Sequence, residues 1–296
     1  MTPIHIMVLR HSAFYSPLIS TITGGFLREE GLSPTYTVAG PDKGVAAGIA
    51  EGTVHVAQSA VATSFAALER GETPPFVHFA QINERDGFFI AAREPEPDFT
   101  WSRLVGRRVL VDHFFQPLAM FKYACHRQGV DFDAIEAVDA GDVAAIDAAF
   151  RAGEGDYVHQ QGPAPQQLEK DGLGHVVASV GRAIGPVAFS SLCASPKWLG
   201  TDMARAFMRA YRRARDYVIE TPAEEIAEAE AEYFPGIDRQ VLTDTIAAYQ
   251  RLGCWAPDPA ISREAYETLL DVFEHSGLIT RRHPYEAAIV APPQDA

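Results

Sequence analysis

The sequence predicts an α/β fold of two lobes, each a mostly parallel sheet flanked by helices, with a helical C-terminal region packed on lobe one. Three observations lead to this prediction. Apolar strand patterns alternate with amphipathic helix patterns along the first two thirds of the chain. A unit of helix, glycine turn and strand at residues 40–60 returns at residues 141–161. Beyond residue 200 the apolar residues keep helical spacing.

The two copies of this unit keep one constant offset. Gly52 and Gly153, which end the predicted helices, are 101 residues apart, and so are Gln58 and His159 at the ends of the predicted strands. Helix–glycine–strand units are common in α/β proteins, so the match also fits coincidence. The alternative is two similar lobes, each presenting a polar strand end to a shared cleft, where open α/β sheets bind ligands.

The remaining elements follow from apolar periodicity and from glycine stops. Helices are expected to end at Gly31, Gly71, Gly129 and Gly277. Strands are expected at residues 3–9, 33–38, 54–57, 76–80, 87–93, 109–111, 135–138, 156–160, 175–179 and 185–194. Helices are expected at residues 18–30, 61–70, 118–128, 168–171, 202–220, 222–233, 238–251 and 262–276. The early β-α-β alternation is typical of a doubly wound sheet.

Composition excludes several classes of partner. The net charge of −14 argues against a nucleic-acid or anionic-membrane surface, and no apolar run reaches the length of a membrane span. The first residues lack the pattern of an export signal, so we expect either a cytoplasmic protein or a sequence given without its signal. Three widely spaced cysteines, Cys125, Cys193 and Cys254, argue against a disulfide framework or a thiolate metal site.

Four segments in order resemble one family. They are GGFLREEGL at residues 24–32, GIAEGTVHVA at 48–57, LVGRRVLV at 104–111, and WAPDP at 255–259 with GLI at 277–279. In this order they resemble the type II periplasmic solute-binding proteins. Within these, the chain is similar to the thiamine-pyrimidine/taurine/sulfonate (NMT1/THI5-like) group of ABC substrate-binding proteins. His55 stands where that group usually has aspartate.

The resemblance implies two lobes joined by hinge strands and closed on one small molecule. Hinges are expected near residues 95–97 and 184–186, with lobe one at residues 1–96 plus 186–296 and lobe two at 97–185. The implied function is the substrate-binding component of an ABC-type transporter, with a small-molecule ligand, a permease partner, a periplasmic location and no membrane insertion. The alternative is a cytoplasmic enzyme on the same fold, such as a lyase, a decarboxylase or a pyrimidine synthase. The cysteine cluster of the pyrimidine synthases is missing from this sequence.

The candidate ligand-binding residues follow the predicted strands. Helices begin after several of them, which favours an anionic group on the ligand. Aromatic side chains suit a flat ring, and the amides suit a pyrimidine or an amide edge. We therefore expect a small planar ligand, anionic or heterocyclic. The candidates are Arg10, His11, Ser12, Phe14, Tyr15, Asp42, Lys43, Gln58, Ser59, Gln81, Asn83, Asp112, His113, Phe114, Phe115, Gln116, His159, Gln160 and Gln161.

Several of these candidates have a second interpretation. Phe14 and Phe115 also fit the core, and Arg10 fits either a clamp for an anion or an ion pair with Asp112. The histidines at predicted strand ends suggest a metal, but HxH and HExxH spacings are missing, so no metal, cofactor or catalytic residue is predicted. In the enzyme alternative, those histidines would act as acid and base.

Overall fold

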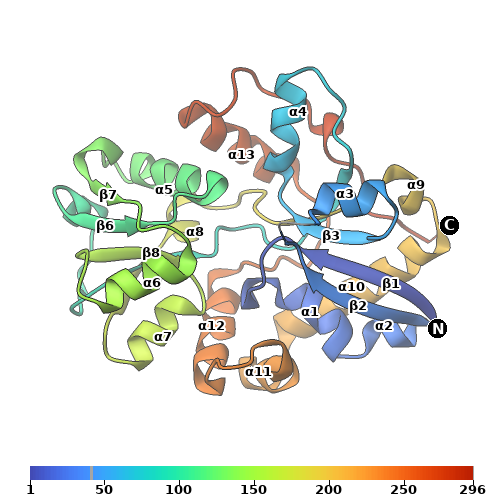
Figure 1. Cartoon of the computed structure of the whole chain (residues 1–296), viewed down its shortest axis with the longest axis horizontal. Coiled ribbons are helices and arrows are strands. Elements are labelled where there is room, and N and C mark those ends of the chain that lie inside the picture. Colours follow the sequence, from blue (N-terminus) through green and yellow to red (C-terminus); the bar gives the residue numbers. More distant parts are fainter. Residues whose placement is uncertain (41–42, 296) are drawn as a thin grey trace.

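The strands form two separate five-stranded sheets, one in each half of the molecule (Figure 1). The computed structural model describes residues 1–40 and 43–295. The first sheet has the order β2-β1-β3-β10-β4, with bounds Leu32–Val38, Thr2–Val8, Val56–Ser59, Ser191–Ala194 and Val77–Gln81. The second has the order β7-β6-β8-β5-β9, with bounds Glu136–Val138, Arg108–Val111, Tyr157–Gln161, Phe88–Ala92 and His175–Ser179.

The two sheets share one topology. In the first, β1 lies between β2 and β3 and is parallel to both, and in the second, β6 is parallel to β7 and β8. The repeated segment at residues 40–60 and 141–161 supplies β3 to the first sheet and β8 to the second. β3 lies beside β1, and β8 lies beside β6. One strand in each sheet is antiparallel to both of its neighbours. It is β10 in the first sheet and β5 in the second. The prediction of an α/β fold with two sheets flanked by helices is confirmed, and both sheets are mixed, because β10 and β5 run antiparallel to their neighbours.

The chain crosses between the sheets at residues 82–87, from β4 to β5, and at residues 185–190, before β10. The first crossing differs from the hinge expected at residues 95–97. The reason is that β5 pairs with β8 and β9, which follow it by more than sixty residues, and not with β4. The half of the molecule built around the first sheet is called the first unit below, and the half built around the second sheet is called the second unit. Residues 94–98 follow β5 and lie within the second unit.

The first sheet is covered by short helices. The segment expected as one helix over residues 18–30 is divided into α1 (Ser16–Thr23) and α2 (Phe26–Glu29), because Gly25 between them has a φ of 76°. The others are η1 (Ala13–Tyr15), α3 (Val45–Ala50), η2 (Val61–Ser64) and α4 (Phe65–Glu69).

The second sheet carries its own helices on both faces (Figure 1). The longest is α5 (Phe115–Arg127), which buries Met120 and Phe121 among other side chains. The second copy of the repeated unit contributes α6 (Val143–Arg151), whose N-terminal N–H of Ala145 is capped by Asp142. The others are η3 (Trp101–Leu104), η4 (Phe132–Ala134), α7 (Ala164–Lys170) and α8 (Val180–Ile184).

The C-terminal region is helical as predicted, and part of it contacts both units. Helices α10 (Asp202–Glu220) and α11 (Ala223–Glu230) pack on α1 in the first unit. Helix α12 (Arg239–Leu252) also contacts α7, and α13 (Arg263–His275) contacts α5, so these two reach the second unit. The short elements are α9 (Pro196–Leu199), η5 (Ala231–Tyr233) and η6 (Tyr285–Ala287).

One hydrophobic core runs through both units and joins them. Phe14 is fully buried at its centre, where its ring contacts those of Tyr249 and Phe189. Buried Arg215 on α10 fixes the start of the first crossing, because its guanidinium donates to the carbonyls of Gln81 and Ile82 at 2.9 and 3.1 Å. Among the described residues, none of the helices is long and apolar enough to cross a lipid bilayer.

Candidate functional site

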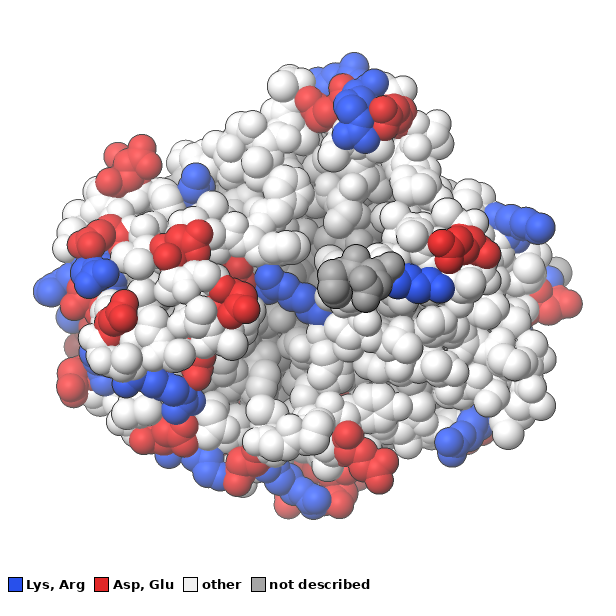
Figure 2. All heavy atoms as spheres, in the orientation of Figure 1, with Lys and Arg blue, Asp and Glu red and all other residues white. Residues whose placement is uncertain are grey.

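A cavity of about 940 Å³ lies between the two units, at the carboxyl ends of β1, β6 and β8. Figure 2 shows this hollow near the middle of the molecular surface. Its volume is within the range of small-molecule sites. The loops after β1 and β6, the last residues of β8 and the first turn of α6 form its wall. The shared topology of the two sheets explains this placement, because it brings equivalent strand ends to one cleft.

The cavity brings together nine of the candidates predicted from the sequence. Five more lining residues carry its charge and shape but were not among the predicted candidates: Asp139, Asp142, Asp147, Arg151 and Gln167. Asp142, Asp147 and Arg151 lie in the second copy of the repeated segment, on α6 or at its N-terminus, so the repeat was a signal that could have found them. The nine predicted residues that line the cavity are Arg10, His11, Ser12, Asp112, His113, Phe114, His159, Gln160 and Gln161.

Arg10 forms an ion pair across the cleft. Its Nη1 lies 3.0 Å from Oδ2 of Asp112, and its guanidinium lies 4.5 Å above the ring centre of Phe114. Asp112 also accepts a hydrogen bond from the Phe114 N–H at 2.9 Å, which fixes the carboxylate. Of the two interpretations of Arg10, the structure therefore shows the ion pair with Asp112.

His159 and Gln160 form the deepest polar part of the cavity. The His159 ring is stacked between Phe88 and Phe121, with ring centres 4.6 and 4.8 Å away. Burial lowers its pKa to about 3, so the imidazole is neutral. Both ring nitrogens of His159, and both amide atoms of Gln160, are buried without a hydrogen-bond partner among the described residues. Such groups carry a desolvation cost that a bound ligand can relieve.

The other two histidines at the cleft are held by the protein itself. His11 donates from Nε2 to the Tyr233 carbonyl at 2.7 Å and accepts at Nδ1 from the Tyr36 hydroxyl at 2.8 Å. Burial lowers its pKa. His113 donates from Nδ1 to the Val111 carbonyl at 2.8 Å. Within residues 1–40 and 43–295, no group of three or more His, Cys, Asp or Glu side chains is placed to hold a metal ion.

Several predicted polar residues support the backbone around the cavity instead of lining it. Gln58 accepts from the Leu9 N–H at 2.9 Å and so fixes the loop that carries Arg10. Asn83 donates to the Phe14 carbonyl at 2.7 Å, and Gln81 donates to the Asp258 carbonyl at 2.8 Å. Gln116 donates to the Phe189 carbonyl at 3.5 Å, and Ser59 bonds to the side-chain hydroxyl of Thr63 at 3.2 Å.

Four further candidates lie away from the cavity wall. Phe14 and Tyr15 are buried in the core, and Phe115 packs edge-on against Phe273 with ring centres 5.1 Å apart. Lys43 lies 3.6 Å from Glu51 at the surface. The last candidate, Asp42, is outside the described residues.

The charge of the cavity wall is negative. Both lining arginines are already paired, Arg10 with Asp112 and Arg151 with Asp147 at 2.5 Å. The carboxylates of Asp139 and Asp142 accept the N–H groups of Gly141 and Ala145 at 2.9 Å each, without a cationic partner among the described side chains. Asp142 thus occupies the N-terminus of α6, the place where an anion was expected to bind. Figure 2 shows further acidic side chains on the left-hand half of this face.

Comparisons with known proteins agree with this architecture. A sequence family described as NMT1/THI5 like matches residues 14–225. The chain belongs to this family. A curated relative, the putative binding protein YtlA of Bacillus subtilis, is 29% identical over 98% of this chain and 88% of its own length.

Solved structures of low sequence identity share the fold. The aliphatic sulphonate binding protein SsuA of Escherichia coli has a TM-score of 0.74 at 17% identity, covering all of this chain and 94% of that one. The alkanesulfonate-binding protein SsuA of Xanthomonas axonopodis, bound to MOPS, has a TM-score of 0.73 at 16% identity, covering 98% and 99%. The periplasmic-binding-protein type II fold and the group suggested by the sequence motifs are confirmed. The solute-binding interpretation is supported, and the enzyme alternative is not.

Proposed function

We propose that this protein is the solute-binding component of an ABC-type transporter, and that its cleft closes on a small, planar, polar ligand that is uncharged or cationic. The observation that carries the proposal is the Gln160 amide, which is 2% exposed and has neither its donor nor its acceptor partnered among the described residues. A ligand edge with adjacent donor and acceptor atoms satisfies both.

The preference for an uncharged or cationic ligand comes from the ion pairs in the cavity. A sulfonate or carboxylate needs a free cation, but Arg10 and Arg151 are paired, while Asp139 and Asp142 leave the wall negative. The preference for a flat ring comes from Phe114, which is half exposed at the cavity. This changes the prediction from the sequence, which favoured an anionic group on the ligand.

Closure is proposed to occur about the two crossings at residues 82–87 and 185–190. The contacts that span the cleft are the Arg10–Asp112 ion pair and a hydrogen bond from the Ser12 hydroxyl to the Gly162 carbonyl at 3.0 Å. In each contact one residue follows a strand of the first sheet and the other follows a strand of the second. The permease partner is part of this proposal and is supported by the resemblance to ABC-type binding proteins.

Thermal-shift and calorimetric titrations with cytosine, benzamidine and taurine test the ligand class. We expect the planar uncharged or cationic probes to raise the melting temperature and taurine to have no effect. Stabilisation by taurine alone contradicts the charge argument, and no effect from any probe contradicts the planar polar ligand.

The variant Gln160→Leu tests the role of the amide. Loss of hydrogen bonds to the probe is expected to weaken binding about tenfold, while the protein without ligand becomes more stable because an unpartnered buried amide is removed. The control, Gln240→Leu, changes an exposed glutamine on α12 outside the cavity. Unchanged affinity in Gln160→Leu would contradict a ligand contact at Gln160.

A further inference from the structure

Exposed large apolar side chains gather at the opening of the cleft. Among the described residues, nine such side chains are exposed, and four of them line the cleft cavity. Leu9 and Val38 belong to the first unit and are 36% and 51% exposed. Phe114 and Val143 belong to the second unit and are 51% and 46% exposed. These four residues are called the apolar rim below.

On the first unit, the backbone fixes the rim at the ends of two neighbouring strands. Val38 is the last residue of β2 and is paired with Val8, the last residue of β1, which Leu9 follows. The Ala39 N–H donates to the Val8 carbonyl at 2.8 Å, and the Leu9 N–H donates to the Gln58 side chain at 2.9 Å. These bonds hold both rim residues beside each other.

On the second unit, the rim lies where two helices begin. Phe114 directly precedes α5, and Val143 is the first residue of α6. Along α6, Val143, Asp147 and Arg151 are four residues apart, so they share one face of the helix, and all three line the cavity. The rim therefore borders the cavity from both units.

The size of the cavity and the exposure of the rim both indicate a ligand larger than a single ring. Contact with water is unfavourable for apolar side chains, and a group of them around one cavity is typical of a binding site. The cavity of about 940 Å³ is near the upper end of the range that holds drug-sized ligands. One ring at Gln160 does not fill it and does not cover the rim.

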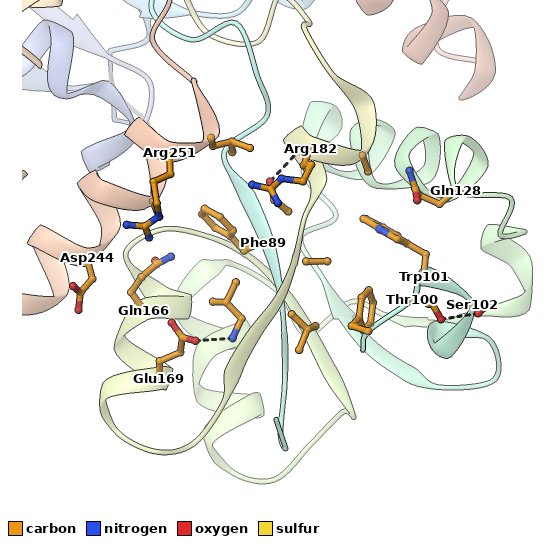
Figure 3. A pocket seen from close by; sticks show the side chains of 18 residues that line it. Phe89, Thr100, Trp101, Ser102, Gln128, Gln166, Glu169, Arg182, Asp244 and Arg251 are labelled. Atoms are coloured by element: carbon orange, nitrogen blue, oxygen red, sulfur yellow. Dashed lines mark hydrogen bonds between the residues drawn. The ribbon is translucent and has the colours of Figure 1, made fainter. Parts of the chain in front are cut away.

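A second hollow shows that this concentration is particular to the cleft. It has a volume of about 840 Å³ and lies beside the edge strand β9 (Figure 3). None of the exposed large apolar side chains of the described residues lines it. Its aromatic side chains Phe89 and Trp101 lie on opposite sides of β9 in Figure 3, so they do not face one ligand.

We propose that the ligand of the cleft carries an apolar substituent, an alkyl or aryl group, on the ring whose polar edge meets Gln160. The inference rests on the proposed function and adds to it the part of the ligand that lies at the cavity opening. Gln160 is buried, whereas the apolar rim is exposed, so the two ends of the cavity match the two ends of an amphipathic molecule. Because the rim belongs to both units, the substituent contacts both when the cleft closes.

Isothermal titration of the full chain with benzamide and 4-propylbenzamide tests this inference. The two compounds share a planar amide and differ by three carbons. Each buried carbon contributes up to about fourfold in affinity, so we expect 4-propylbenzamide to bind about tenfold more tightly or better. Equal or weaker binding of 4-propylbenzamide overturns the inference. If benzamide still binds and loses affinity in Gln160→Leu, the proposed function stands without it, and if neither compound binds, both fail.

The variants Val38→Ser and Val143→Ser test the contact with the rim, one on each unit. Each is expected to reduce the preference for 4-propylbenzamide over benzamide about threefold or more, because apolar contact area is lost. The matched control is Val105→Ser, at a valine that is 49% exposed outside the cavity, and it should keep the full preference. An unchanged preference in both rim variants overturns the inference. This includes an equal loss of affinity for both compounds, which would assign the rim to closure of the cleft.

The heat-capacity change of binding gives a measurement on the native protein alone. Burial of apolar surface makes this change more negative. Titrations at several temperatures should therefore give a more negative value for 4-propylbenzamide than for benzamide. Equal values would mean that the propyl group stays in water, and they would overturn the inference.

Discussion

Glu230 is a fully buried carboxyl group that contacts two serine hydroxyls of α1. Its oxygens lie 2.7 Å from Ser16 Oγ and 2.8 Å from Ser20 Oγ. Ser16 has a single hydroxyl proton and also donates to the Ala13 carbonyl at 2.8 Å, so a proton on Glu230 completes the network. Burial raises the pKa of Glu230 to about 8, and the serine contacts only partly oppose this. The group is therefore protonated in the folded protein near neutral pH.

This raised pKa predicts a pH-dependent stability. The folded protein binds the proton more tightly than the unfolded chain, so the contribution is complete below about pH 4.5 and is lost as the pH rises through about 8. The variant Glu230→Gln keeps an amide donor and acceptor for the serines without a titrating group. We expect the difference in unfolding free energy between native protein and variant to change with pH, by at most about 1.4 kcal/mol per pH unit. Urea unfolding at pH 5, 6.5 and 8 measures it, and a constant difference would contradict the prediction.

At the scale of elements, helix α8 packs directly against the first crossing between the sheets. A Cβ atom built on Gly181 of α8 would lie 2.2 Å from the Asp86 carbonyl oxygen. Asp86 itself is fully buried in this crossing, accepts the Phe88 N–H at 2.6 Å, and has its pKa raised by burial to about 7. The crossing is therefore held by backbone packing as well as by a buried carboxyl group.

The variant Gly181→Ala tests this packing. Because the new methyl group meets backbone and not a flexible side chain, α8 or the crossing has to move, and we expect a loss of about 1–3 kcal/mol in unfolding free energy. The matched control is Gly200→Ala, where the nearest atom to the added Cβ is 3.7 Å away. Equal stabilities of the two variants in urea unfolding would show that α8 does not constrain the crossing.

At the scale of the whole molecule, the two units are joined by the core, by α12 and α13, and by the ion pair across the cleft. The side chains of Arg10 and Asp112 are 29% and 7% exposed, so the pair is partly shielded from water. Removing the Arg10 side chain leaves the Asp112 carboxylate as a largely buried, unpaired charge. This favours an arrangement of the two units in which Asp112 reaches solvent. In the proposed closure, the ion pair therefore favours the closed arrangement.

Small-angle scattering on Arg10→Ala measures this effect. We expect a radius of gyration above that of the native protein, for which a compact chain of this length gives about 19 Å. A ligand that binds the cleft should reduce the difference, because it favours closure. The control is Arg103→Ala, which removes a pair with Glu96 at 3.2 Å inside the second unit. If both variants scatter like the native protein, the ion pair does not control closure.

The site was only partly predictable, because residue type and position along the chain do not show which way a side chain points. Gln58 and His159 occupy equivalent places in the repeat, yet Gln58 supports the Leu9 backbone and His159 lines the cavity. Arg10 had two interpretations in the sequence, and its partner lies 102 residues away. The acidic residues at the start of α6 disfavour the anionic ligand that the sequence suggested. Only the folded structure shows that these residues line the cavity.

The fold class, the family and the order of most helices and strands could be predicted from the amino-acid sequence. These depend on apolar spacing, glycine stops and short motifs, all of which act within about a dozen residues. Only the folded structure shows that β5 belongs to the second sheet and that α12 and α13 contact both units. The physical reason is that strand pairing and cavity walls join residues far apart in the chain, and the local pattern of a strand does not encode its partner.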